Sequence, residues 1–197
     1  MGFSRAELES FRGGTLPDLL GPGTRLLFVG VNPGLWTVAV QAHFGRRGNR
    51  FYPALLRAGI LDRLIDASAG FSVEDRALLL KRGIGITSLV AGATARADEL
   101  EPVELVAGAR NLARLVGQIR PKVVAVLGIT AFRKAFGRPD ARVGRQPEDL
   151  AGAQLWVVPN PSGLNAHASL HDLAAAYREV ALAAGVLRRP GARPGPE

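Results

Sequence analysis

The chain has 197 residues, of which 47% are hydrophobic, and this suits one α/β domain with a substantial core. Cysteine is absent and only three histidines are present, which excludes disulfides, thiolate nucleophiles and iron–sulfur clusters and disfavours a metal site. Lysine and arginine number 25 against 17 acidic residues, and the net charge of +8 favours polyanionic partners such as nucleic acid. Part of this excess lies in the C-terminal tail, and a GC-rich genome would also enrich arginine.

The ends of the chain and its apolar runs bear on its compartment. Residues 1–12 mix acidic and basic side chains without an apolar core, so they do not resemble a signal peptide. No apolar run approaches the roughly 20 residues that a membrane-spanning helix needs. We therefore expect a soluble protein of a reducing cytoplasm.

In the first half of the chain, two predicted strands alternate with helical segments. Residues 1–24 contain a short helix and a Gly/Pro-rich connector, and the aliphatic run at 26–31 predicts the first strand. Asn49 can cap the next helix, and Ser72, with an aspartate three residues later, has the form of a capping box. A second aliphatic run, at 84–89, predicts the next strand. Continuous apolar runs of this kind indicate strands that are buried on both faces.

The second half repeats this alternation. Pro102 suits the first position of a long helix, and the runs at 123–127 and 155–158 predict two more strands. Ser169, again followed three residues later by aspartate, predicts the start of the last helix. The Pro/Gly-rich residues 188–197 predict a disordered tail.

The order of these elements predicts the fold. Strands that alternate with helices form right-handed βαβ units. We therefore expect an α/β fold, a three-layer α/β/α sandwich around a mainly parallel sheet of four to five strands. One domain is expected to span residues 25–187, with residues 1–24 as an N-terminal extension.

Polar loops follow three of the predicted strands, where ligands bind in open parallel sheets. They comprise residues 30–34, residues 87–89 with 94–99, and residues 159–165. Taken singly, the first and the third of these loops are also explained as ordinary turns, because Asn-Pro and Pro-Ser-Gly are turn-forming combinations.

Two of the loops carry a more specific pattern, Gly-Val-Asn-Pro-Gly at 30–34 and Asn-Pro-Ser-Gly-Leu at 160–164. Together they resemble the two signature motifs of the mismatch-specific uracil/thymine-DNA glycosylases, within the uracil-DNA glycosylase superfamily. Further segments are similar to that family at corresponding places, namely residues 48–52, 83–87 and 174–179. The resemblance covers residues 25–187, nearly the whole predicted domain.

The resemblance implies a monofunctional base-excision-repair enzyme that acts on double-stranded DNA without a metal or a cofactor. Such an enzyme flips uracil or a related pyrimidine, preferentially opposite guanine, out of the duplex and hydrolyses its N-glycosidic bond. An abasic site remains. The resemblance also implies a monomer that works in a bacterial-type cytoplasm at the nucleoid.

Two residues are candidates for handling the attacking water. The resemblance gives Asn32 this role; an amide cannot act as a general base, but it can fix the direction of a water by accepting a hydrogen bond. Asp98, in the polar loop after the second strand, is a second candidate because a carboxylate can activate water. Alternatively, Asp98 and Glu99 supply favourable charge at the start of the following helix.

Five residues are candidates for binding the substrate nucleotide. The resemblance gives Phe44 the stacking position, although Phe44 could also be a core residue. Backbone amides near Val31 and Phe44 are candidates for the uracil edge, and Asn160 for a further contact. Gly34, with Pro33, would let backbone N–H groups approach phosphate. Thr37, where a smaller side chain would admit substituents on the base, suggests a preference for uracil over thymine.

The second motif and a basic cluster are candidates for contacting DNA. Leu164 would fill the gap that the extruded nucleotide leaves in the duplex. The expected DNA-binding residues are Ser162, Gly163, Leu164, Asn165, Ala166, Arg46 and Arg47. For Arg46, Arg47 and the nearby Arg50, phosphate neutralisation and a solvated face are equal alternatives.

Two other classes of function are weighed against this one. A nucleic-acid-binding domain of the same fold without activity is consistent with so weak a catalyst as Asn32. A small-molecule α/β enzyme is disfavoured, because the chain has neither a Gly-x-Gly-x-x-Gly nucleotide fingerprint nor a Gly-x-Ser-x-Gly nucleophile elbow.

Overall fold

The computed structural model describes residues 2–165 and 168–188, which form an α/β fold on one five-stranded sheet. The strands are β1 (Leu26–Gly30), β2 (Ile84–Ser88), β3 (Val123–Leu127), β4 (Gly144–Arg145) and β5 (Gln154–Val158). Their order across the sheet is β2-β1-β3-β5-β4, and all neighbours are parallel except β4, which is antiparallel to β5. The predicted mainly parallel sheet is thus confirmed.

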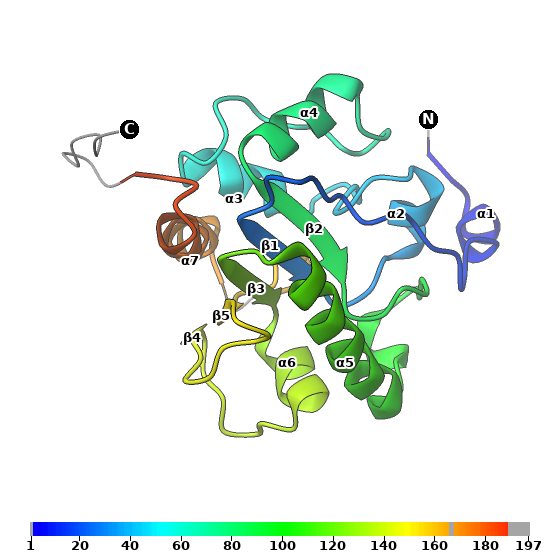
Figure 1. The fold of residues 1–197 in the computed structure, drawn as a ribbon. Coiled ribbons are helices and arrows are strands. Elements are labelled where there is room, and N and C mark those ends of the chain that lie inside the picture. The colour runs from blue at the N-terminus through cyan, green and yellow to red at the C-terminus, as the bar shows by residue number, and fades with distance from the viewer. Residues whose placement is uncertain (1, 166–167, 189–197) are drawn as a thin grey trace.

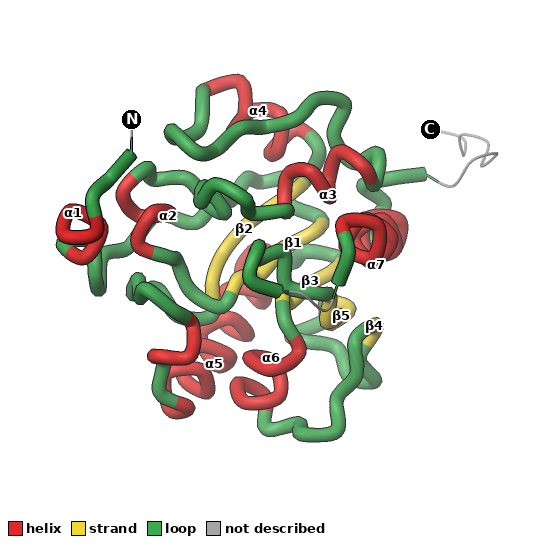
Figure 2. The backbone as a smooth tube through the Cα atoms, turned by 180° about the vertical axis from the view of Figure 1, so that it is seen from behind, coloured by secondary structure: helices red, strands yellow, loops and turns green. Residues whose placement is uncertain are grey.

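Helices cover both faces of this sheet (Figures 1 and 2). They are α1 (Arg5–Glu9), α2 (Leu35–Ala39), α3 (Phe51–Arg57), α4 (Val73–Lys81), α5 (Pro102–Ile119), α6 (Ile129–Phe136) and α7 (Leu170–Ala183), with a short 3-10 turn η1 (Ala97–Glu99). Buried residues of α5 and α6 pack on one face, and those of α3, α4 and α7 pack on the other. This is the predicted three-layer sandwich.

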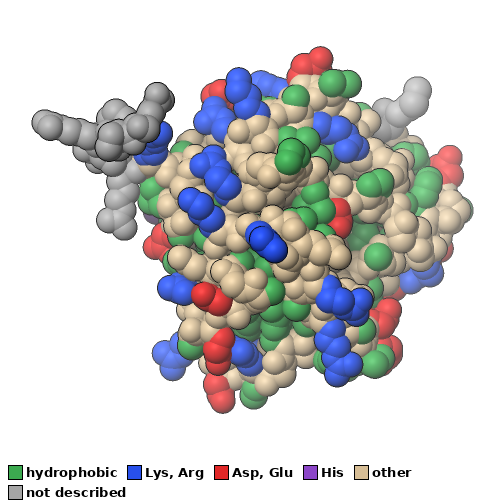
Figure 3. Space-filling model, in the orientation of Figure 1, with side chains coloured by type: hydrophobic (Ala, Val, Ile, Leu, Met, Phe, Trp, Pro, Cys, Tyr) green, Lys and Arg blue, Asp and Glu red, His purple; other side chains and the backbone are tan. Residues whose placement is uncertain are grey.

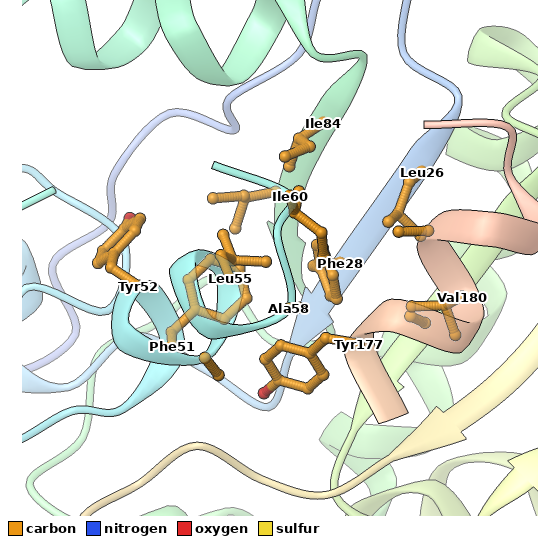
Figure 4. Packing of buried hydrophobic residues seen from close by; sticks show 14 of the residues in the cluster. Leu26, Phe28, Phe51, Tyr52, Leu55, Ala58, Ile60, Ile84, Tyr177 and Val180 are labelled. Carbon is orange, nitrogen blue, oxygen red and sulfur yellow. The ribbon is translucent and has the colours of Figure 1, made fainter. Parts of the chain in front are cut away.

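The central strand β1 divides its side chains between these two layers. Leu26 and Phe28 face the α3/α7 side, and Leu27 and Val29 face the α5/α6 side, as the alternation of a strand requires. On the α3/α7 side the Phe28 ring lies 5.1 Å from that of Phe51, centroid to centroid (Figure 4). Because Phe51 begins α3, this contact anchors the loop that precedes the helix.

The predicted starts of α4, α5 and α7 are confirmed. Ser72 and Ser169 each form a capping box with the aspartate three residues later, and Pro102 stands in the first turn of α5. The Asn49 side chain accepts a bond from the backbone N–H of Phe51 at 2.9 Å, although Arg50 is the N-cap residue of α3.

Several elements differ from the prediction. The strands predicted at 26–31 and 84–89 end one residue earlier, where the polar loops begin. The helices α2 and α6 and the strand β4 were not predicted. The N-cap positions of α2 and α6 are Gly34 and Gly128, which have no side chain that could signal a helix start. β4 is only two residues long.

The segment predicted as an N-terminal extension packs closely on the rest of the molecule. Leu19 forms an antiparallel bridge with Ile86 at the edge of the sheet. Phe11 and Leu16 pack against the buried side chains of Leu35 and Val38, and through them on α2, which follows the first motif. These contacts tie the segment to the elements around the first motif.

Within residues 2–165 and 168–188, no helix is long and apolar enough to cross a membrane. On the face seen in Figure 1, lysine and arginine side chains are scattered and do not form one patch (Figure 3). The predicted DNA contact Ala166 and most of the tail predicted as disordered, residues 189–197, lie outside the described residues.

Candidate functional site

The two motif loops leave the sheet at the same edge, because β1 and β5 both run parallel to β3 between them. A Cβ atom built on Gly30, the last residue of β1, would lie 3.7 Å from the Phe44 ring. A Cβ atom on Gly128, just after β3, would lie 3.4 Å from the Asn160 amide nitrogen. Phe44 and Asn160 therefore stand over neighbouring strand ends, which lie roughly 5 Å apart in a sheet.

Asn32 is half-buried in the first motif, and its amide has one defined orientation. Its Nδ2 donates to the carbonyl of Gly92 at 3.1 Å and to the hydroxyl of Thr94 at 2.8 Å. The Thr94 hydroxyl in turn donates to the carbonyl of Arg96, so it must accept from Asn32. Both amide hydrogens are thereby engaged, which leaves Oδ1 as the group that can receive a hydrogen bond from a ligand.

Asp98 lies in η1 and forms a two-pronged ion pair with Arg96, with its side chain 63% exposed. The hydrogen bond from Arg96 lowers the carboxyl pKa from its usual range. A lowered pKa makes a carboxylate a poorer base. The geometry therefore gives no support to the predicted role of Asp98 as a base.

The alternative places Asp98 and Glu99 as charges at the start of the following helix, and the structure places both in the first turn of the short 3-10 turn η1 and not in α5. α5 begins at Pro102, and its capping box is formed by Glu101 and Glu104. Glu99 instead lies 2.5 Å from Arg12 of the N-terminal segment. Both acidic residues of η1 thus pair with arginines on the surface.

Phe44 is half-buried, and one face of its ring stacks on Phe51 at 4.1 Å between centroids. Its backbone has a left-handed φ of 56°, which is uncommon for a residue with a large side chain. Two bonds hold the preceding residue: the Tyr52 hydroxyl donates to the carbonyl of His43 at 2.7 Å, and the His43 ring lies 3.1 Å from the carbonyl of Pro17. The Phe44 ring is thus fixed between a core aromatic and the end of β1.

Burial sets the ionisation of His43. His43 is 5% exposed, and desolvation of its ring lowers the pKa to about 4. Near neutral pH it is uncharged, and its Nε2 can donate to Pro17. Sequence analysis did not identify His43 or Tyr52 as supports of Phe44.

The other predicted base contacts lie around these groups. Val31 is half-buried and accepts a backbone bond from Val90 at 3.0 Å. Gly34 is the N-cap residue of α2, and a Cβ atom built on it would meet nothing within 4 Å. Thr37 is buried within α2.

The second motif is held together by its own side chains. The Asn160 carboxamide oxygen accepts from the backbone N–H of Ser162 at 2.9 Å, and the Asn165 amide donates to the carbonyl of Asn160 at 2.9 Å. Ser162 Oγ accepts from the backbone N–H of Leu164 at 3.3 Å. The loop presents Leu164 outward, with 77% of the residue exposed.

The three arginines of the basic cluster separate into two kinds. Arg46 and Arg47 are exposed. Arg50 matches neither interpretation of the cluster, because its guanidinium is turned inward and donates to backbone carbonyls of the second motif and of the residues that follow it.

A cavity of about 280 Å³ lies beside this site. Asp18, His43, Thr87 and Ser88 line it, whereas Asn32, Phe44 and Asn160 do not. Burial raises the pKa of Asp18. Among the described residues there is no cluster of three or more histidine and acidic side chains that could hold a metal ion.

The comparison with known families decides what kind of protein carries these loops. The model of the uracil DNA glycosylase superfamily matches residues 17–183. The chain belongs to the uracil DNA glycosylase superfamily. Its similarity to this superfamily supports a role as a DNA glycosylase, a hydrolase of DNA repair with DNA as its substrate.

A solved structure agrees with the superfamily fold. The chain is similar to the solution NMR structure of a proposed uracil DNA glycosylase from Methanosarcina acetivorans, with a TM-score of 0.56 at 16% identity. The match covers 85% of this chain and 98% of the other. At this identity the similarity concerns the fold alone. The chain shares that fold over almost the whole length of the Methanosarcina acetivorans protein.

Proposed function

We propose that the protein is a monofunctional DNA glycosylase of the mismatch-specific type. It would excise uracil opposite guanine from double-stranded DNA by direct attack of water. The observation that carries the proposal is the oriented amide of Asn32, at the sheet edge that also bears Phe44 and Asn160. The two motifs that resemble the mismatch-specific enzymes supply Asn32 and Asn160, and the loop before α3 supplies Phe44.

In the proposed reaction, a water that donates a hydrogen bond to Asn32 Oδ1 attacks C1′ of the flipped nucleotide. The C1′–N1 bond breaks, its electron pair leaves with the base, and the water loses a proton to solvent. Asn32 orients the water but does not take its proton, so the rate depends on the leaving group and on donors to the base. This chemistry predicts a slow enzyme.

The face of the Phe44 ring that is turned away from Phe51 is the proposed stacking surface for the base, because Phe51 covers the other face. Asn160 would contact the base from the neighbouring strand end. The buried Thr37 would limit room beside the base and favour uracil over thymine.

Leu164 is the proposed wedge. Its exposed side chain could enter the duplex where the nucleotide has left, which would offset part of the lost stacking. Arg46 and Arg47 would neutralise phosphates nearby. A mispaired uracil costs less to flip than a paired one, which contributes to the preference for G·U.

A panel of labelled duplexes tests this function. Excision is followed under single-turnover conditions, with alkaline cleavage of the abasic sites as the readout. We expect the wild-type protein to excise the base from a G·U duplex faster than from an A·U duplex, and from a G·T duplex slowest. Comparable rates on G·U and G·T would refute the role of Thr37. Binding to the G·U duplex without any cleavage would instead support a DNA-binding domain without activity.

A further inference from the structure

Arg50 joins the two halves of the site. It is the N-cap residue of α3, and its side chain reaches the loop that carries the proposed wedge. Nη1 donates to the carbonyl of Ala168 at 2.5 Å. Nη2 donates to the carbonyls of Ser162 at 3.0 Å and Asn165 at 2.7 Å. One guanidinium therefore holds the wedge loop at both ends.

Backbone contacts reinforce this connection. The N–H of Arg50 donates to the carbonyl of Pro161 at 3.0 Å. Gly163 lies so close to the preceding loop that a Cβ atom on it would stand 2.8 Å from the carbonyl oxygen of Gly48. On the other side, the Tyr177 hydroxyl donates to the carbonyl of Pro159 at 3.3 Å. The wedge loop is thus bonded directly to the start of α3.

Among the described residues, the Arg50 guanidinium forms no hydrogen bond or ion pair other than these hydrogen bonds to carbonyl groups. No carboxylate there pairs with Arg50, and its buried Nε has no hydrogen-bond partner. Removing a cation from water is costly, and here only carbonyl oxygens compensate for that cost. An arginine placed to neutralise phosphate would keep its head group in water.

The wedge itself has little packing that could hold it in place. Leu164 is 77% exposed, and Ser162 to Asn165 form no regular secondary structure. A loose loop would lose conformational freedom on entering the duplex, and this cost would oppose base flipping. A loop already fixed by Arg50 avoids most of that loss.

We propose that Arg50 is a positioning residue that fixes the wedge loop for extruding the base from a duplex. The inference rests on the proposed glycosylase function. It assigns Arg50 to the flipping step and not to hydrolysis. Loss of Arg50 should therefore slow reactions in which flipping is difficult and spare those in which the base is already unstacked.

Two substrates separate these steps: uracil opposite guanine, and uracil opposite an abasic spacer, where flipping costs less. We expect Arg50→Met to slow single-turnover excision from the G·U duplex about tenfold or more and from the spacer duplex less than about threefold. Arg50→Lys, which keeps the charge but not the planar fork, should lie between Arg50→Met and wild type on G·U. Gly163→Ala should reproduce the split, because it displaces the same loop without touching Arg50.

Arg178→Met is the matched control. Arg178 also donates to a backbone carbonyl, that of Ala58 at 2.9 Å. This bond joins α7 to the C-terminal end of α3, and no hydrogen bond from Arg178 to the described residues of the wedge loop is present. We expect its rates on both duplexes to equal those of wild type. Circular dichroism melts establish which variants fold. If Arg50→Met is unfolded, Arg50→Lys and Gly163→Ala carry the test.

Flipping is also measured without hydrolysis, from the fluorescence of 2-aminopurine placed beside a non-hydrolysable 2′-fluorouridine opposite guanine. Arg50→Met should lose most of the increase that wild type produces. Equal slowing on both duplexes, no slowing on either, or an undiminished fluorescence increase would overturn the inference. If wild type releases uracil from neither duplex, the proposed function fails, and the fluorescence signal alone decides on Arg50.

Discussion

The role proposed for Asn32 follows from its motif, but the orientation of its amide follows only from the folded structure. Its motif marks it as the candidate for holding water, but the sequence does not indicate which way its amide points. The donors' partners, Gly92 and Thr94, lie 60 and 62 positions further along the chain. No local pattern connects positions so far apart. Only the folded arrangement leaves Oδ1 as the free acceptor.

Asp98 gives the clearest test among single residues. Because its carboxylate is exposed and paired with Arg96, we expect Asp98→Asn to change single-turnover excision from a G·U duplex by less than about threefold, since exposed ion pairs contribute little. DNA affinity, measured by fluorescence anisotropy, should also stay close to that of wild type. A sharp fall in turnover with unchanged affinity would restore Asp98 as the base.

Among the elements, those that the sequence predicted are those with strong local signals. β1, β2, β3 and β5 fall on runs rich in β-branched or aliphatic residues, and α4, α5 and α7 begin with capping boxes or proline. α6 starts from Gly128 at a φ of 121°, without a side-chain cap, so the end of β3 and not a local motif positions it. The support of Phe44 by His43 and Tyr52 was missed for the same reason. It depends on a contact with Pro17, 26 positions earlier.

The loop that carries Phe44 should respond to pH through His43. Burial lowers the folded-state pKa to about 4 from 6.5, so the neutral ring stabilises the fold fully above pH 6.5. That contribution is lost as the pH falls from 6.5 to about 4, and it amounts to about 3 kcal/mol at most. Urea unfolding at pH 7.5, 5.5 and 4.5 measures it.

Carboxylates also titrate in this pH range, so the contribution of His43 is isolated by comparing wild type with a His43 variant. His43→Gln should show a smaller loss of stability between pH 7.5 and 4.5 than wild type does. His171→Gln, a change at an exposed histidine of α7, is the control and should keep the wild-type slope. Equal slopes for wild type and His43→Gln would show that His43 does not cause the dependence.

For the whole molecule, the sequence was most informative where two separate segments had to agree. The carboxyl ends of parallel strands lie at the same edge of a sheet. Since residues 30–34 and 160–164 each follow a predicted parallel strand, the sequence predicts that both segments lie at that edge. The structure brings Phe44 and Asn160 to adjacent strand ends there. The tie between the N-terminal segment and α2 was not predicted, because scattered apolar residues such as Phe11 and Leu16 form no periodic pattern.

The account depends above all on a water directed by Asn32, and the most direct measurement is the single-turnover rate of uracil release from a G·U duplex by Asn32→Ala. We expect the rate to fall about 100-fold or more while the dissociation constant for the duplex stays within about threefold. Asn111→Ala, a change at an exposed asparagine of α5, should behave as wild type. An Asn32→Ala protein that releases uracil at the wild-type rate would contradict the account.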